Sequence, residues 1–226
     1  MKQGGSEVAK RAAGESAAEA VEDGMVVGLG TGSTAAHAIR AIGRAVDAGL
    51  DVAGVPTSFQ ARELARDCGI PLVDLDEASV DLAIDGADEV AGGDLVKGGG
   101  AAHAREKVVD ASADRFLVVA DPTKLADDLS HPVPVEVLPA ARTTVADVVR
   151  GLGGDPTLRA AERKDGPVVT DNGNLVLDCD FGTIDAPADL GGTLADTPGV
   201  VEHGLFVDLA DEVHVGTADG VTVHDR

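Results

Sequence analysis

The feature that most constrains the fold is a regular alternation, between residues 7 and 121, of short apolar runs with longer amphipathic segments. The apolar runs are rich in valine, leucine and isoleucine, as buried parallel strands are, whereas the longer segments repeat apolar residues with the period of a helix. The pattern predicts strands at 25–30, 51–55, 71–75, 80–85 and 115–121, and helices at 7–21, 31–46, 58–69 and 101–112. Strands that alternate with helices predict an open parallel sheet covered on both faces.

The rhythm changes after Pro132 and indicates a second, smaller α+β unit. An Asn-Gly pair at Asn172, between two apolar runs, predicts a hairpin turn there. The expected segments are a strand at 133–139, a helix at 143–151, the hairpin within 167–179, a helix at 186–196 and an apolar segment at 199–207. The tail, 211–223, reads as strand, turn and strand, and we expect it to return to the first sheet. These boundaries place one domain at 1–130 plus 204–226 and the smaller domain at 131–203.

The chain is strongly acidic, with 40 Asp and Glu against 18 Lys and Arg and a net charge of −22. This charge repels nucleic acids and anionic membrane surfaces, so neither is an expected partner. Abundant acid with few lysines resembles proteins of salt-loving organisms, in which salt screens the self-repulsion. The sequence contains neither an apolar N-terminal leader nor a long apolar span, and Cys68 and Cys179 are expected to be buried free thiols. We therefore expect a cytoplasmic protein.

The segment Gly30-Thr31-Gly32-Ser33-Thr34 follows the first predicted strand and opens a helix. Glycines let a ligand approach the backbone, and free N–H groups with the helix dipole favour an anion. The segment has no lysine for a P-loop, and Ser33 breaks the GxGxxG pattern of a dinucleotide loop. A phosphate monoester is the ligand that fits best. The alternative is a tight turn with Ser33 or Thr34 as a helix cap.

A second segment, Asp85-Gly86-Ala87-Asp88-Glu89, closes a predicted strand with two aspartates three residues apart. The spacing differs from that of a calcium-binding loop. Ordinary turn chemistry explains an Asp-Gly pair as readily as a catalytic role does. Because ligands of open α/β sheets bind at the carboxyl ends of the strands, we take these carboxylates as candidates for acid–base chemistry.

A third segment, Lys97-Gly98-Gly99-Gly100, puts a lysine before three glycines. Consecutive glycines cost backbone entropy on folding, and N–H groups that must approach a ligand explain them best. Glu106 follows in the next predicted helix, where the alternative role is a surface ion pair. Together with the two earlier segments, these groups are the parts needed to move protons on a sugar phosphate.

Seven motifs occur in one order along nearly the whole chain: GTGST, DGADE, KGGGAA followed by REK, DPTKL, PVPVEVLP, VVTDNGN and PGVVEHGLF. In order and spacing they closely resemble ribose-5-phosphate isomerase of the A type. The resemblance implies a Rossmann-like α/β main domain closed by C-terminal strands, with a smaller ferredoxin-like α+β domain inserted. It also implies metal-free and cofactor-free interconversion of ribose 5-phosphate and ribulose 5-phosphate, in the non-oxidative branch of the pentose phosphate pathway, by a homodimer or homotetramer.

The resemblance also implies roles for single residues. Glu106 of REK would be the base that moves a proton between C2 and C1 through a cis-enediolate. Asp85 or Asp88 would assist ring opening, and Lys97 would stabilise the oxyanion. The implied substrate-binding residues are Lys10, Thr31, Gly32, Ser33, Thr34, Gly86, Ala87, Gly98, Gly99, Gly100 and Lys124. Two departures from the family's usual motifs, His103-Ala104 for Leu-Thr and DPTK for D-x-S-K, leave these charged residues in place.

Two other classes of function are alternatives. A sugar-phosphate sensor of similar fold would bind the ligand without needing Glu106, but such regulators contain a basic helix-turn-helix, which is not seen here. An amino-sugar phosphate deaminase or a CoA transferase on a related scaffold is the other alternative. No pair of histidines has the spacing of a helical metal site, so we expect no bound metal.

Overall fold

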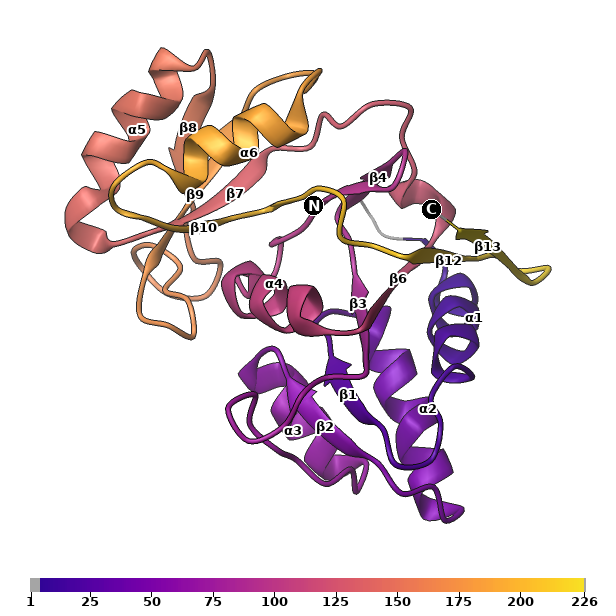
Figure 1. Ribbon diagram of the computed structural model, residues 1–226. Helices are drawn as coiled ribbons and strands as arrows, with labels where there is room; N and C mark the ends of the chain where they lie inside the picture. Colours follow the sequence, from indigo (N-terminus) through magenta and orange to yellow (C-terminus); the bar gives the residue numbers. More distant parts are fainter. Residues whose placement is uncertain (1–4, 226) are drawn as a thin grey trace. The chain divides into compact units, whose positions relative to one another are not determined.

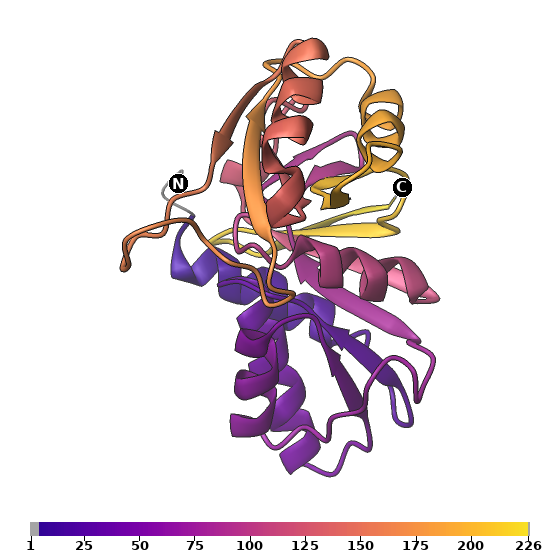
Figure 2. The ribbon, with the colours of Figure 1, turned by 90° about the vertical axis from the view of Figure 1, so that its left-hand side faces the viewer.

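The structure, a computed structural model, describes residues 5–225, which form two compact units (Figures 1 and 2). The first unit contains the residues up to 87, residues 105–125 and the residues from 209 onward, and the second contains residues 88–104 and 126–208. The chain thus leaves the first unit twice and returns to it twice. The expected division at 130 and 204 differs from this mainly in residues 88–104, which we had assigned to the main domain.

A six-stranded sheet forms the centre of the first unit. Its strands are β1 (Val26–Leu29), β2 (Ala53–Pro56), β3 (Leu82–Gly86), β6 (Arg115–Ala120), β12 (Glu212–Gly216) and β13 (Val221–Asp225). Their spatial order is β13-β12-β6-β3-β1-β2, and all neighbours are parallel except β12 and β13. Val27 of β1, for example, lies between Gly54 and Leu82. The parallel pairing of β12 with β6 confirms that the tail returns to the first sheet.

Helices cover both faces of this sheet. They are α1 (Glu7–Ala18), α2 (Ala35–Asp47), α3 (Phe59–Asp67) and α4 (His103–Ser112), with a short 3₁₀ helix, η1 (Pro122–Lys124), after β6. Ala13 of α1, Ile39 of α2 and Ala61 of α3 share one buried cluster with Val27 and Leu29 of β1. These three helices therefore pack on one face, and the cluster consists of aliphatic side chains, as the scarcity of aromatic residues requires.

Helix α4 packs on the opposite face. Gly28 lies between two residues of the first cluster, so it points away from that cluster. A side chain at Gly28 would come within 2.8 Å of Val109 on α4. Val109 in turn packs with Val55 of β2. The helix approaches β1 this closely because residue 28 has no side chain.

The second unit contains a four-stranded antiparallel sheet with two helices. The elements are β7 (Val133–Val137), η2 (Pro139–Ala141), α5 (Arg142–Gly151), β8 (Asp155–Leu158), β9 (Leu175–Asp180), α6 (Pro187–Ala195) and β10 (Val200–His203). The strand order is β10-β7-β9-β8, and α5 lies along β8 and β9 in Figure 2. Val135, Val149, Leu177 and Leu194 join the sheet and both helices in one core. The order β-α-β-β-α-β along the chain is that of a ferredoxin-like unit.

A small three-stranded sheet explains why residues 88–104 belong to the second unit. Its strands are β4 (Glu89–Ala91), β5 (Asp94–Val96) and β11 (Leu205–Phe206), in the order β11-β5-β4. Val96 and Leu205 are buried in the same cluster as the core of the four-stranded sheet. The hairpin β4–β5 was not predicted, because three-residue strands are too short to show a period.

Two expected strands are reduced to isolated bridges. Residues 71–75 form a single bridge, between Gly54 and Leu72, and residues 167–170 pair only through bridges at Pro167 and Val169. The predicted turn at Asn172 is present, since the Thr170 N–H donates to the carbonyl of Asn174 at 2.9 Å. Between residues 5 and 225, no helix is both long and apolar enough to cross a bilayer.

Candidate active site

The first sheet has a topological switch point between β1 and β3. The chain runs from β1 through α2 to β2 on one side, whereas β3 lies on the other side of β1 and continues toward β6. In open α/β sheets, ligands bind at such a point, beyond the carboxyl ends of the strands. The segment that begins at Gly30 follows β1, and Asp85 lies near the end of β3. The sequence-predicted GTGST and DGADE motifs therefore meet at this edge of the sheet.

The loop after β1 is bonded directly to the Asp85 carboxyl. The Thr31 N–H donates to Asp85 Oδ1 at 2.9 Å, and the Gly86 N–H donates to the same oxygen at 2.7 Å. Asp85 is fully buried. A side chain at Gly30 would clash with the Asp85 carboxyl, so this approach requires glycine. These backbone donors fix the position of a buried carboxylate at the carboxyl edge of the sheet.

The hydroxyl of Thr31 is held by two residues that the sequence analysis missed. It lies 2.9 Å from the Thr57 hydroxyl and 2.7 Å from the Ser58 hydroxyl, and Thr57 Oγ1 donates to the carbonyl of Leu29. Thr57 and Ser58 follow β2, so they also come from the carboxyl edge of the sheet. Their position directly after a strand was a usable signal, although a Thr-Ser pair is too common to identify alone.

Helix α2 begins directly after the loop that holds Asp85. Thr34 occupies the N-cap position, but its backbone is helical and its side chain makes no capping hydrogen bond, so it is not a hydroxyl cap of the ordinary kind. The first turn of α2 contains no acidic residue. Gly32 has a positive φ of 106°, and Ser33 is exposed. The helix start thus keeps the positive end of its dipole without an internal carboxylate.

Glu106 lies in the first turn of α4 and is 5% exposed. Val109 and Asp110 follow Glu106 by three and four residues and are buried as well, so Glu106 shares a buried helix face with them. Val109 on that face meets β1 at Gly28, so the face is turned toward the sheet. Because a crossover helix runs antiparallel to the parallel strand that follows it, its first turn lies at the carboxyl edge of the sheet. Glu106 is therefore a buried carboxylate at the same edge as Asp85.

Two lysines of the first unit differ in their surroundings. Lys124 is half-buried at the end of η1, directly after β6. Lys10 on α1 has a side chain 13% exposed, and its Nζ lies 3.2 Å from Glu7 Oε1. Glu7 also lies 3.4 Å from His37 Nε2 on α2. In the described residues Lys10 is thus engaged with its own helix.

The Asp121 carboxylate links η1, which contains Lys124, to the residue that precedes the N-cap of α1, the helix that contains Lys10. Its Oδ1 accepts from the N–H of Thr123 at 2.9 Å and from the Thr123 hydroxyl at 2.6 Å, and its Oδ2 accepts from the N–H of Gly5 at 3.1 Å. Burial acts to raise the pKa of Asp121, but the Thr123 and Gly5 hydrogen bonds and the charge of Lys124 outweigh it and hold the pKa below its usual value. Asp121 was not among the predicted site residues, although DPTK was among the motifs.

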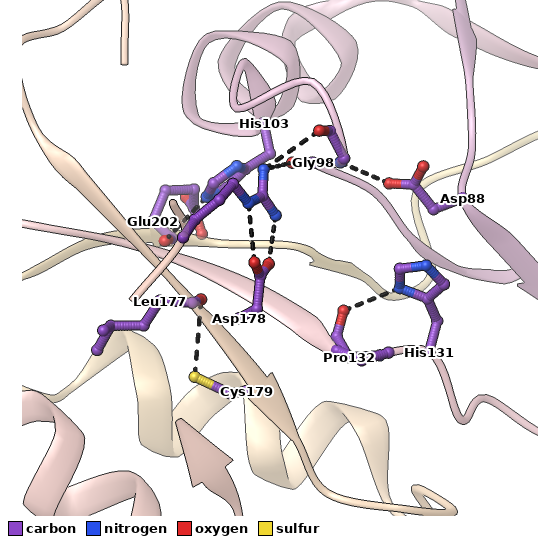
Figure 3. Close-up of polar contacts among 11 residues, drawn as sticks. Asp88, Gly98, His103, His131, Pro132, Leu177, Asp178, Cys179 and Glu202 are labelled. Carbon is purple, nitrogen blue, oxygen red and sulfur yellow. Dashed lines mark hydrogen bonds and ion pairs between the residues drawn. The ribbon is translucent and has the colours of Figure 1, made fainter. Parts of the chain in front are cut away.

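Asp88, Lys97 and the three glycines that follow Lys97 belong to the second unit. The Asp88 carboxylate accepts from the Gly99 N–H at 2.6 Å, so DGADE and KGGG are joined there (Figure 3). Lys97 is 2% exposed; its N–H donates to the carbonyl of Gly204 at 2.8 Å, and its Nζ lies 5.2 Å from the centre of the Phe206 ring. A buried lysine over an aromatic face is stabilised as a cation.

The DGADE motif contains three more residues, Gly86, Ala87 and Glu89. Glu89 is buried and accepts from the N–H groups of Ser130 and His131, which makes it a structural carboxylate. Ala87 is half-buried, as is Gly86, and a side chain at Gly86 would meet nothing nearer than 3.8 Å. Throughout residues 5–225, no three His, Cys, Asp or Glu side chains are grouped so that they could hold a metal ion.

The fold and the site together define a class: an α/β protein with two buried carboxylates, Asp85 and Glu106, and a helix start without acidic residues at the carboxyl edge of a parallel sheet. This arrangement is typical of enzymes that bind small ligands beyond the strand ends.

Comparisons with known proteins identify the family. The family described as ribose 5-phosphate isomerase A (phosphoriboisomerase A) matches residues 53–220. Ribose-5-phosphate isomerase A of Haloarcula marismortui is 81% identical over 223 residues, which cover 99% of this chain and 98% of the relative. The structure of ribose 5-phosphate isomerase A from Methanocaldococcus jannaschii is 46% identical with a TM-score of 0.93, over 96% of this chain and 98% of that one. A D-ribose-5-phosphate isomerase in complex with phospho-erythronic acid is 44% identical with a TM-score of 0.94, over 96% and 97%.

The chain belongs to the ribose 5-phosphate isomerase A family, and it is an isomerase.

Proposed function

We propose that this isomerase interconverts D-ribose 5-phosphate and D-ribulose 5-phosphate through a cis-enediolate, with Glu106 as the general base. The observation that supports this most strongly is the complex of a 44% identical relative with phospho-erythronic acid. That compound has a planar anionic carboxylate and a phosphate, which are the two charged features of a sugar-phosphate enediolate. A ligand that resembles the intermediate favours an enediolate route over a hydride shift.

The proton transfers are assigned to three carboxylates. Asp85 or Asp88 assists the opening of the furanose ring by moving a proton between O1 and the ring oxygen. Glu106 then removes the proton from C2 and returns it to C1, while the proton of the O2 hydroxyl passes to O1, so that no proton is gained or lost overall. The buried position of Glu106 supports this role, because a desolvated carboxylate is a stronger base than an exposed one. Asp88 comes to the proposal through the family motif DGADE.

Lys97 and the glycines after it are assigned to the oxyanion that forms on the enediolate. Lys97 is buried beside Phe206, and a cation held in this way suits a developing negative charge. The Gly99 N–H already donates to Asp88, so we assign it to holding that carboxylate. Gly98 and Gly100 remain the backbone candidates for the oxyanion.

The phosphate is assigned to the start of α2, with Gly32, Ser33 and Thr34 as its contacts. Lys124 would add a positive charge that acts alike on substrate and transition state, since the phosphate is distant from C1 and C2. A phosphate would compete with Glu7 for the Lys10 ammonium, which lies 3.2 Å from the Glu7 carboxylate. Homodimer or homotetramer formation remains an expectation drawn from the family.

The central test is the variant Glu106→Gln, which keeps the size of the side chain but removes the base. We expect kcat for ribose 5-phosphate to fall by at least about 10²-fold, while fold and ligand affinity persist. The exposed residue Glu22 provides a matched control, and Glu22→Gln should leave kcat unchanged. The assay measures ribulose 5-phosphate formation in molar salt with EDTA present, and glucosamine 6-phosphate serves as the substrate of the deaminase alternative. Near-normal turnover in Glu106→Gln would remove Glu106 from this role.

Solvent isotope incorporation tests the route itself. During turnover in D₂O, a proton held on a carboxylate can exchange with solvent, so some deuterium should appear at C1 of ribulose 5-phosphate. A hydride shift would transfer the C2 hydrogen intact. Deuterium at C1 therefore supports the enediolate, and its amount reports how well Glu106 is shielded from water.

A further inference from the structure

The Arg159 guanidinium contacts the glycine loop that follows Lys97. Arg159 Nη1 donates to the carbonyl of Gly98 at 2.8 Å and to the carbonyl of Gly99 at 3.2 Å. The same guanidinium donates through Nε to Asp178 Oδ2 at 2.9 Å and through Nη2 to Asp178 Oδ1, so it forms a two-point ion pair (Figure 3). One arginine thus joins a strand carboxylate to two consecutive peptide groups of the loop.

The position of this pair follows from strand register. Leu158 of β8 lies opposite Leu177 of β9, and both contact the core of the second unit. Asp178 and Arg159 are each the next residue in sequence, so they point to the opposite face of the four-stranded sheet. The Arg159 side chain is 15% exposed and that of Asp178 is 33% exposed. Burial to this degree makes the charge-assisted hydrogen bonds stronger than those of a surface pair.

Within the loop, the Ala101 N–H donates to the carbonyl of Gly98 at 2.9 Å, so Arg159 and Ala101 share this acceptor. Gly98 has a positive φ of 108°, and a side chain there would come within 2.7 Å of His103 Nδ1, so only glycine fits. Glycines have the widest choice of backbone conformations, so contacts from outside the loop add to the order of their peptide planes. Arg159 fixes the carbonyls of Gly98 and Gly99, and Asp88 accepts from the N–H of Gly99.

We infer that Arg159, oriented by Asp178, is a positioning residue for catalysis, because it fixes the peptide groups of the Gly98–Gly99 loop and so the orientation of the Asp88 carboxylate and of Lys97. The inference rests on the proposed function of Asp88 and Lys97. The planar fork of arginine reaches both carbonyls and the carboxylate at once, which the single ammonium of lysine cannot do. Misplacement of reacting groups by about 1 Å can cost 10²-fold in rate, so the loop needs such a fixed support.

The test compares Arg159→Ala and Arg159→Lys with a control pair in the same unit. Arg150 and Asp147 form an ion pair on α5, with side chains 56% and 70% exposed, and Arg150→Ala is the matched control. We expect Arg159→Ala to lower kcat by roughly 10–10²-fold with KM changed by less than about 3-fold. Arg159→Lys should recover only part of kcat, and Arg150→Ala should match the wild type. Hydrogen exchange of the amides in residues 97–101 should quicken in Arg159→Ala.

The outcomes are separable. Unchanged kcat in a folded Arg159→Ala, or full recovery by Arg159→Lys, would overturn the inference, as would an equal loss in Arg150→Ala. Should Arg159→Ala fail to fold, Arg159→Lys decides, since a folded variant with reduced kcat supports the inference and one with wild-type kcat overturns it. Failure of the proposed function is distinct, because the wild type itself would then not convert ribose 5-phosphate.

Discussion

Gly30 is the residue at which the backbone after β1 comes closest to the Asp85 carboxyl. A side chain there would overlap that carboxyl, and the N–H of Thr31, the next residue, is one of its two backbone donors. The absence of a side chain at position 30 therefore determines where a buried acid is placed. Glycine is needed at position 30 because it leaves room for the Asp85 carboxyl, and not because the backbone there has a positive φ.

The substitution Gly30→Ala tests this at the residue scale. The added methyl group must displace Asp85, so we expect a loss of stability of roughly 1–3 kcal/mol and a lower kcat. Both are measured, by thermal unfolding and by the isomerase assay. Gly192 on α6 is the control, because a side chain there would meet nothing within 4 Å. Gly192→Ala should raise stability by up to about 1 kcal/mol and leave kcat unchanged, and a Gly30→Ala protein that behaves the same way would contradict the argument.

Residue types and spacing made Asp85, Asp88 and Lys97 candidates, because charged residues beside glycines at strand ends are unusual. Glu106 became a candidate through its place in the helix after the glycines and through the family motif REK. Residue types and spacing did not identify Thr57, Ser58 or Arg159. A hydroxyl or an arginine gains its role from a partner far along the chain, such as Gly98 for Arg159, and spacing along the sequence does not report that distance.

At the scale of elements, Asp121 anchors the residues before α1 and the short helix η1. Its carboxylate accepts from Gly5, which precedes α1, and from Thr123 within η1. Because these bonds hold the pKa of Asp121 below its usual value, folding favours the ionised form. The stability gained is present above the unfolded-state pKa of about 3.9 and is lost as the pH falls through the folded-state pKa.

The variant Asp121→Asn tests the anchor. We expect a lower Tm than the wild type at pH 7, because the amide cannot accept from all three donors with two carboxylate oxygens. As the pH falls from about 5 toward 3, the wild type should lose Tm more steeply, and the two curves should converge. Asp128→Asn, at an exposed position, should follow the wild-type curve. A Tm difference between wild type and Asp121→Asn that stays constant across this pH range would show that ionisation of Asp121 is not the source of the stabilisation.

The order of helices and strands in the first sheet could be predicted because strands of four to six residues alternate with clear helices. Residues 71–75 have the same apolar character but form only one bridge. Pro71 has no N–H to donate, and after Val73 bonds to Gly54 the chain turns at Asp74. The β4–β5 hairpin, in contrast, forms strands without a strand-like pattern in the sequence. Its strands are very short, and its turn depends on Gly92 and Gly93, both with positive φ.

At the scale of the whole molecule, the large net negative charge is the property that most affects stability. There are 40 acidic and 18 basic side chains, so even complete pairing would leave 40 − 18 = 22 negative charges. Self-repulsion of this size opposes the compact state, and salt weakens it by shortening the screening length from about 10 Å at 0.1 M to about 3 Å at 1 M. We propose that the protein is adapted to high salt.

We expect Tm at pH 7 to rise as KCl is increased from 0.05 to 1 M. Each kcal/mol gained should raise Tm by about 2–4 °C for a chain of this length. At pH 5, nearer the pI of about 4.4, the net charge is smaller and the same salt range should raise Tm less. A Tm that is flat or falls with salt at pH 7 would contradict the proposed adaptation.

Because β6 pairs with β12, the central sheet cannot be completed until the ribosome has synthesised the C-terminal part of the chain. Leu117 lies opposite Glu212, so the two partners are 212 − 117 = 95 residues apart in synthesis. At about 5–20 residues per second, a ribosome needs roughly 5–20 s to reach the second strand after the first. During that interval residues 126–208 are synthesised as one contiguous stretch, while one side of β6 has no neighbour. An unpaired strand edge can pair with other chains, so the total time needed to translate this stretch determines how long each new molecule is exposed to aggregation.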